Sequence, residues 1–382
     1  MNVRFTLDGS GELEERLERI CQKVLAGAQR LVPAPEFEAL VLGGGYGRGQ
    51  GGVLQTDAGD RPYNDLEFYV FLRGNILLNE PKYRGLLNDL GAQLSPEAGL
   101  HVEFKVYSVE KLRQSAISMF SYDLVAGHKM IFGSEDIFKT CRHHLAAEQI
   151  PPNEATRLLF NRCSGLLLAK NYLRQKTLAV EQQDFIGRNI AKAQLAFGDA
   201  VLTVFGKYHW SCVERAERLK TLAVPEAPSW LPEILPHHAA GVDFKLHPRR
   251  ETAPKPDLER RHAEAAALGL RLWRWAESRR LTCPFESARN YALSRTVKCP
   301  ESRPWRNALL SLRAFGSEAA FDGYFLRYPR ERLMNALCLL LWDDQATAEP
   351  ALQRQLQKLL HSKNIEWPDF IHAYQVLWQN YG

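Results

Sequence analysis

The chain of 382 residues has an ordinary globular composition, with 45% hydrophobic residues, 24% charged residues and a formal net charge of +5. Its length allows two domains, and the weak positive charge permits a phosphate-bearing partner without requiring one. Seven cysteines without a CxxC pair argue against a disulfide framework or a zinc ribbon. No secretory signal or membrane-length apolar run is visible, so we expect a cytoplasmic protein.

Predicted helices and short strands alternate through the first third of the chain. The spacing of apolar residues predicts helices over 12–31, near 80–94 and near 109–125. Short apolar or alternating segments predict strands at 39–42, 65–71, 101–107 and 128–132.

Helical patterns dominate from residue 154 onward, over 154–176, 183–206 and a block at 258–380. Between the last two, 223–257 is rich in Pro and His, and we expect it to sustain neither helix nor central strand. The sequence therefore predicts an α+β protein. Its expected parts are an N-terminal domain over 1–150, a central helical region over 151–222, the Pro-rich connection over 223–257 and a C-terminal helical region over 258–382.

Two of the predicted strands carry acidic residues on their polar faces. Asp65 and Glu67 are two positions apart, so they project from the same face of one strand, and Glu103 lies on the polar face of another. If these strands are neighbours with matched faces, three carboxylates converge and need a cation between them. Oxygen ligands of this kind select Mg²⁺ or Mn²⁺.

A glycine cluster, GGGYGRGQGG at 43–52, follows the first predicted strand. Glycines in this position allow backbone N–H groups to approach phosphate oxygens without obstruction. The cluster also satisfies the GxGxxG pattern of dinucleotide-binding folds, but the sequence after it has no helical face, as that motif requires. A P-loop is excluded because Gly-Lys-Ser/Thr is missing.

Together these segments resemble the DNA polymerase β-type nucleotidyltransferase superfamily. The matching text is LVLGGGYGRG, then YNDLEFYVF, then HVEFKVY, and SYDLVAGHKMIFG is similar to the elements that often close this domain. The resemblance covers about 37–135. The loop between Gly45 and Asp65 is longer than usual, so we expect a hairpin-like insertion, and Glu67 replaces a commoner Asp.

The resemblance implies a nucleotidyltransferase-type mixed sheet and transfer of an NMP from an NTP, with ATP as the default, and release of pyrophosphate. The predicted site residues share roles in metal or phosphate binding: Asp65, Glu67 and Glu103 as catalytic metal ligands for Mg²⁺ or Mn²⁺, Gly44 and Gly45 as the phosphate-binding pair, and Arg48 and Lys192 as nucleotide contacts. The acceptor stays open among a small-molecule hydroxyl, an RNA end, a protein side chain and a second nucleotide.

Two other interpretations stay open. A degenerate member of the superfamily would bind a nucleotide without transferring it and act as a regulatory or scaffold protein through its helical half. A toxin-type enzyme of a two-gene module would carry the same acidic residues. Retention of all three acids favours an enzyme over the degenerate form.

Overall fold

A computed structural model describes residues 4–224, 228–321 and 323–382. The chain forms two compact units. Unit 1 is Met1–Glu154 with Val201–Arg250, and unit 2 is Ala155–Ala200 with Glu251–Gly382. Residues 201–250 thus belong with the predicted catalytic domain. Within the described ranges, no helix has both the length and the apolar character needed to cross a membrane.

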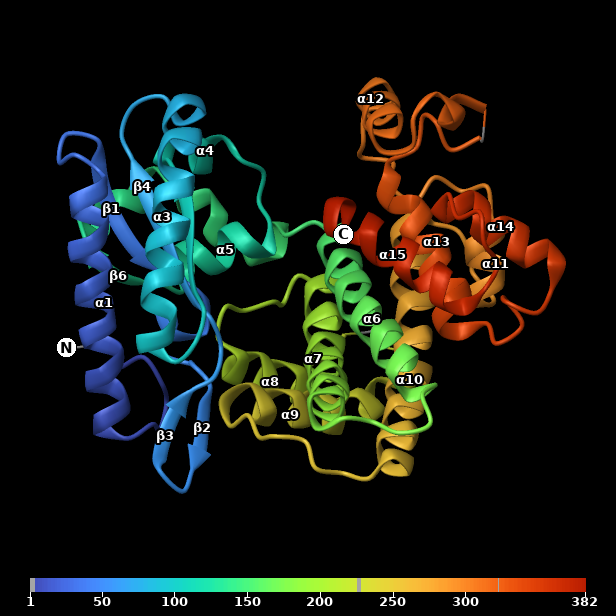
Figure 1. Cartoon of the computed structure of the whole chain (residues 1–382), viewed down its shortest axis with the longest axis horizontal. Helices are drawn as coiled ribbons and strands as arrows, with labels where there is room; N and C mark the ends of the chain where they lie inside the picture. Colours follow the sequence, from blue (N-terminus) through green and yellow to red (C-terminus); the bar gives the residue numbers. More distant parts are fainter. Residues whose placement is uncertain (1–3, 225–227, 322) are drawn as a thin grey trace. The chain divides into compact units, whose positions relative to one another are not determined.

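Unit 1 is an α+β structure (Figure 1). Its elements are α1 (Gly11–Leu31), β1 (Phe37–Leu42), α2 (Gly44–Gly47), β2 (Val53–Thr56), β3 (Gly59–Pro62), β4 (Leu66–Leu72), α3 (Ile76–Ala98), β5 (Val102–Tyr107), α4 (Val109–Gln114), α5 (Met119–Ala126), β6 (Lys129–Phe132), α8 (Cys212–Lys220), α9 (Leu231–Leu246) and the 3-10 helices η1 (Glu135–Leu145) and η2 (Ala147–Gln149). Helices α6 (Asn153–Leu173) and α7 (Val180–Val204) each contribute to both units.

The main sheet of unit 1 is mixed, with the strand order β5-β4-β1-β6. Strand β4 is antiparallel to β1 and parallel to β5, and α3 makes the crossover that a parallel pair requires. Helices α1 and α3 cover one face of the sheet (Figure 1). Residues of α4, α5 and η1 pack on the other face, against Tyr69 and Phe71. The predicted mixed sheet with flanking helices is confirmed at this level.

Helix α1 forms where the apolar spacing predicted it. Ser10 caps it, accepting a hydrogen bond from the Leu13 backbone N–H. Leu13, Leu17 and Val24 recur at helical spacing on one side, and all three are buried against the sheet. This stripe fixes which side of α1 faces the core.

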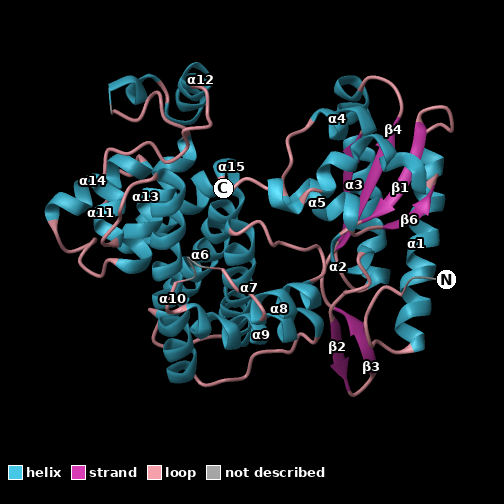
Figure 2. Ribbon diagram, turned by 180° about the vertical axis from the view of Figure 1, so that it is seen from behind, coloured by secondary structure: helices cyan, strands magenta, loops and turns pink. Residues whose placement is uncertain are grey.

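The long connection between the glycine cluster and β4 forms a separate hairpin. Strands β2 and β3 pair antiparallel from Val53↔Pro62 to Thr56↔Gly59 (Figure 2). Gly59, with φ +97°, closes the turn in a backbone conformation that favours glycine. The predicted hairpin-like insertion before Asp65 is confirmed.

One predicted helix is two helices in the structure. The segment near 109–125 is broken between α4 and α5, because the Ser118 side chain accepts a hydrogen bond from the Ser121 N–H and begins a new helix. Ser115 ends α4 with extended backbone at ψ 152°. The expectation of one continuous helix is therefore wrong.

The expectation that 223–257 sustains no helix is also wrong, because Leu231–Leu246 forms α9. Pro232 lies in the first turn, where its missing N–H has no intrahelical acceptor in any case. Pro236 lies inside the helix, but tertiary packing within unit 1 stabilises the segment through buried residues, among them Ile234 and Val242. Residues 225–227 of that predicted connection lie outside the described residues.

Unit 2 is helical, as predicted for this part of the chain. Besides its parts of α6 and α7 it contains α10 (Lys255–Leu281), α11 (Ala288–Leu293), α12 (Pro304–Phe315), η3 (Ser317–Phe321), α13 (Pro329–Trp342), α14 (Pro350–Leu360) and α15 (Trp367–Tyr381). Buried residues occupy nearly every position of α13, which makes it the central helix of this unit. A buried carboxylate, Glu277, accepts hydrogen bonds from Thr156, Tyr291 and Arg280.

We expect Leu17→Ala to lower the free energy of unfolding by about 2–5 kcal/mol, because it leaves a cavity between α1 and the sheet. Leu17 is 1% exposed, whereas Leu77, on α3, is 77% exposed. The matched control Leu77→Ala should change stability by less than about 0.5 kcal/mol. Urea unfolding of both variants measures this, and equal stabilities would contradict the burial of α1.

Candidate functional site

Glu67 and Glu103 face each other across the parallel pair of β4 and β5. The pairing register sets Glu67 directly opposite Glu103 and Phe68 opposite Phe104. Because side chains alternate along a strand, both carboxylates project from the same face. The structure thus brings together two of the three predicted acids. Both side chains are partly exposed, at 32% and 39%.

Lys105, two residues after Glu103, lies between these carboxylates. Its Nζ is 3.3 Å from Glu67 Oε2 and 3.2 Å from Glu103 Oε2. Burial lowers the pKa of Lys105, but the carboxylates of Glu67 and Glu103 outweigh burial, so its pKa is raised overall. The sequence places Lys105 on the same strand face as Glu103, yet its charge was not included in the predicted site.

Tyr69 adds a fourth group to Glu67, Glu103 and Lys105. Its hydroxyl donates a hydrogen bond to Glu67 Oε2 at 3.1 Å. Burial raises the pKa of the Tyr69 phenol, and the charge of Glu67 raises it further. Tyr69 therefore stays protonated and holds the Glu67 carboxylate in place.

Asp65 lies one residue before β4 and is exposed. The predicted strand 65–71 is thus shifted by one residue, to Leu66–Leu72. In the described part of the chain, no group of three or more His, Cys, Asp or Glu side chains is placed to hold a metal ion. Glu67 and Glu103 therefore lie together, and Asp65 does not join them as a third metal ligand in the observed side-chain positions.

The glycine turn passes directly beside Glu67. The Gly43 N–H donates to the Glu67 carbonyl at 2.9 Å, which ties the turn to β4. Gly44 has φ +62°, and a Cβ added to it would lie 2.8 Å from Glu67 Oε1. A side chain at position 44 would thus occupy space next to the carboxylate. Of the predicted phosphate-binding pair, Gly44 is thus adjacent to Glu67, whereas a Cβ added to Gly45 would lie 3.0 Å from the Gln50 carbonyl oxygen.

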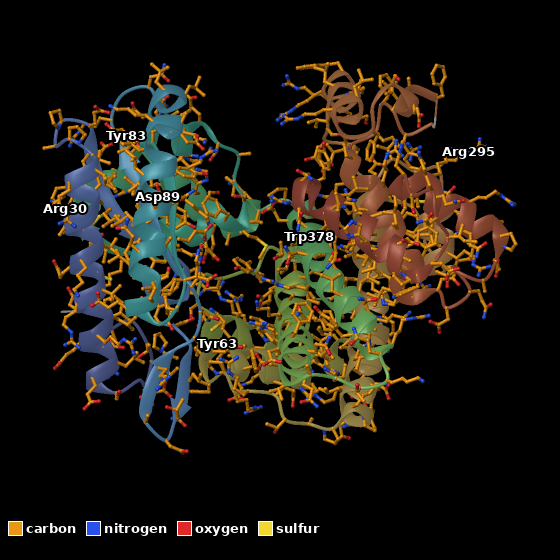
Figure 3. All side chains as sticks on the ribbon, viewed as in Figure 1. Arg30, Tyr63, Tyr83, Asp89, Arg295 and Trp378 are labelled. Atoms are coloured by element: carbon orange, nitrogen blue, oxygen red, sulfur yellow. The ribbon has the colours of Figure 1, made fainter. Side chains whose placement is uncertain are left out.

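Tyr46 connects the glycine turn with the end of the hairpin. Its hydroxyl donates to the Gly52 carbonyl at 2.8 Å and accepts from the Tyr63 N–H at 2.9 Å. Tyr63, labelled in Figure 3, lies two residues before Asp65 and packs edge-on against Phe244. Burial raises the pKa of Tyr46 to about 12. This contact fixes the entry of the chain into β4.

Arg48, a predicted nucleotide contact, is engaged by a carboxylate. Its Nη1 lies 3.1 Å from Asp123 Oδ2, and the side chain is only 13% exposed. The Tyr208 hydroxyl donates to the same Asp123 oxygen at 3.2 Å. Burial raises the pKa of Asp123, while Arg48 opposes that effect. Asp123 is thus a partly buried partner of Arg48 that the sequence pattern did not indicate.

The far side of the glycine turn is supported by residues from 201–250. The Gln50 side chain donates to Ser211 Oγ and accepts from the Cys212 N–H at 2.9 Å. The Lys245 carbonyl lies 3.0 Å from the position of a Cβ at Gly52. Burial, and to a smaller extent the positive charge of Arg48, lower the pKa of Lys245 to about 8. This support has no local sequence signal, since it joins segments more than 150 residues apart.

Lys192, the other predicted nucleotide contact, lies on α7 in unit 2 and is exposed. The helix predicted over 183–206 is confirmed, and its side chains at Ile186, Ile190 and Phe197 are fully buried. The role of Lys192 in nucleotide binding stays a prediction.

Comparison of the chain with known protein families, with curated proteins and with solved structures finds no match. The geometry of the site therefore carries the functional argument.

We expect Gly44→Ala to displace the Glu67 carboxylate and to lower the free energy of unfolding by about 1–2 kcal/mol, because a left-handed backbone is strained with a Cβ. Gly11, at the start of α1, has open space around its Cβ position, so Gly11→Ala is the matched control. Unfolding curves measure the stability difference. Equal stability of the two variants would contradict the conformation at Gly44.

We expect Lys245→Met to be more stable than the wild type at pH 7, with the difference shrinking as the pH rises toward 10. The pKa of Lys245 is about 8, below the ordinary value of 10.5. The unfolded chain therefore binds more protons between these values, so the contribution of Lys245 to stability rises with pH. Unfolding at both pH values tests this, with exposed Lys23→Met as the control. A pH-independent difference for Lys245→Met would contradict the burial of its ammonium.

Proposed function

We propose that the chain is a metal-dependent nucleotidyltransferase, which moves an NMP from an NTP, with ATP as the default, to an acceptor and releases pyrophosphate. One observation carries the proposal: Glu67 and Glu103 are paired in register on one sheet face, with Gly44 against the Glu67 carboxylate. The order of strand, glycine turn, acidic strand and second acidic strand fits the resemblance to the DNA polymerase β-type superfamily.

The donor set fits a hard divalent cation. Mg²⁺ in phosphoryl-transfer sites typically takes one or two carboxylates and completes its shell with water and substrate phosphates. Glu67 and Glu103 supply two carboxylates, and Asp65 lies two residues from Glu67 at an exposed position. When bound, Mg²⁺ or Mn²⁺ supplies charge neutralisation for the attacking and leaving oxygens.

The residues of the chain would then position the reactants. The acceptor oxygen forms a bond to the α-phosphorus as the bond to the bridging oxygen of the β-phosphate breaks, and pyrophosphate leaves with that oxygen. Glu103 accepts the proton of the acceptor hydroxyl. The backbone of Gly44 and Gly45 would face the phosphates without side chains in the way. Arg48 would contact them only if a phosphate draws it from its ion pair with Asp123.

A second function is favoured by one specific observation. Lys105 lies within 3.3 Å of both carboxylates and offsets one of their two negative charges, and the described residues contain no group of three or more His, Cys, Asp or Glu side chains placed to hold a metal ion. These features fit the alternative of a catalytically inactive protein that binds a nucleotide and acts as a regulatory or scaffold subunit. In that protein Lys105 would take the place of the metal ion permanently.

We expect Glu67→Gln or Glu103→Gln to reduce Mg²⁺-dependent transfer by about a hundredfold or more, because the neutral amide cannot hold the cation or take the proton. The assay incubates the full chain with each α-labelled NTP, Mg²⁺ or Mn²⁺ and cell extract, and measures labelled product and pyrophosphate. Glu15→Gln is the matched control, since that side chain is 75% exposed on α1.

Each outcome of this assay separates the two functions. Undiminished transfer by both Gln variants would refute the assignment of these acids. Metal-dependent NTP binding by the wild type without pyrophosphate release would favour the inactive alternative. In that case Lys105→Met should remove the positive charge that is paired with Glu67 and Glu103. The variant should then bind divalent cations more tightly than the wild type, as measured by calorimetry.

A further inference from the structure

Helix α12 of unit 2 has its polar and apolar faces reversed. Trp305, Leu309 and Leu312 are exposed, at 61%, 59% and 41%. Asn307 and Ser311, in contrast, are buried, at 2% and 0%. In a helix that only packs on its own protein, the apolar side chains face inward. Here they face outward.

The spacing of these residues places them on two opposite sides of the helix. Trp305, Leu309 and Leu312 are separated by four and three positions, so they form one continuous stripe. Asn307 and Ser311 are four positions apart on the opposite side. Figures 1 and 2 show α12 at one end of unit 2, beyond the packed helices α10, α13 and α15.

Polar contacts hold the helix in this orientation. The Asn307 amide donates to Ser302 Oγ at 2.8 Å and to the Leu326 carbonyl at 3.1 Å. The buried Ser311 hydroxyl has no hydrogen-bond partner within the described part of the chain. A buried hydroxyl without a partner is costly. The orientation of α12 thus costs free energy on both of its sides, because leucines are exposed on one side and an unpaired hydroxyl is buried on the other. This points to a partner that covers the stripe.

Arginines accompany the stripe on one side. Arg306 and Arg313 are exposed, and α12, with the sequence PWRNALLSLRAF, contains no acidic residue. On a helical projection both arginines fall next to Leu309, at i−3 and i+4. In the described residues neither has an ion pair. The surface thus offers an apolar strip bordered by positive charge.

We propose that α12 is the docking site for an amphipathic helix of a partner protein, with apolar residues at i, i+3, i+4 and i+7 and acidic residues along one side. A second amphipathic helix presents an apolar stripe of the same width, and acidic side chains on one border match Arg306 and Arg313. This inference does not depend on the proposed activity.

Two other occupants fit less well. A second copy of the chain would bring the arginines of one α12 against those of the other, and like charges at a contact disfavour it. An anionic membrane surface would attract the arginines, but Arg306 and Arg313 are the only basic residues of α12. Membrane-surface helices are instead rich in basic residues on their polar face.

The test measures binding of the full chain to a fluorescein-labelled helical peptide of about 18 residues, long enough to be partly helical in water. The peptide carries Leu at i, i+3, i+4 and i+7 and Glu along one side. A control peptide has Lys in place of every Glu. By fluorescence anisotropy, we expect at least about tenfold tighter binding of the acidic peptide, a difference in keeping with charge complementarity.

Variants of the full chain then assign the binding to α12. Leu309→Ser should weaken acidic-peptide binding by about tenfold, and the double change Arg306→Glu with Arg313→Glu should reverse the preference between peptides. Leu78→Ser, at a 70% exposed leucine of α3, is the matched control and should change nothing. Circular dichroism checks that each variant is folded.

Four outcomes would overturn the proposal. Equal binding of both peptides, or binding unchanged by Leu309→Ser, would exclude α12 as an acidic-helix site. Sedimentation with phosphatidylglycerol vesicles that Leu309→Ser abolishes, without any peptide preference, would assign the stripe to a membrane surface. A concentration-dependent dimer that Leu309→Ser abolishes, again without peptide preference, would assign it to a second copy.

Discussion

The parallel pairing of β4 with β5 is the constraint on which the candidate site depends. It sets Glu67 opposite Glu103, and like charges directly opposite each other on neighbouring strands are destabilising. The ammonium of Lys105 lies within 3.3 Å of Glu67 and 3.2 Å of Glu103 and offsets their repulsion. Because a one-residue slip would turn every side chain to the other face, the buried Phe68 and Phe104 lock this register. The packing of the core thus determines where the carboxylates meet.

The glycine turn depends on a second set of contacts, which come from a distant part of the sequence. Gln50 is hydrogen-bonded to Ser211 and Cys212, and Arg48 to Asp123. Glycines confer no rigidity of their own, since they lose more conformational freedom on folding than other residues. The turn is held instead by Tyr46 and by this buried polar support. These hydrogen bonds explain why residues 201–250 belong to the same compact unit as Glu67 and Glu103.

The sequence predicted those strands and helices in which apolar residues recur at regular spacing. The alternation in β4 and β5 placed Glu67 and Glu103 on one face of the sheet. The spacing of apolar residues in α1 likewise predicted the helix whose stripe is buried. The prediction failed where tertiary packing overrides local preference: α9 forms despite Pro236. Asp65 lies one residue outside the strand that was expected to carry it. The ion pair of Arg48 with Asp123 joins residues 75 positions apart, so no local pattern indicates it.

The charge of the acidic site bears on both proposed functions. The two carboxylates of Glu67 and Glu103 exceed the single ammonium of Lys105 by one negative charge, so the pair still attracts a cation. Lys105 is 37% exposed and carries its charge on a flexible four-carbon stem, so it can leave the carboxylates without disturbing β5. A bound cation and Lys105 would then compete for the same oxygens. The distinction between an enzyme and an inert nucleotide-binding protein therefore rests on this competition, since the fold of the sheet is the same in both.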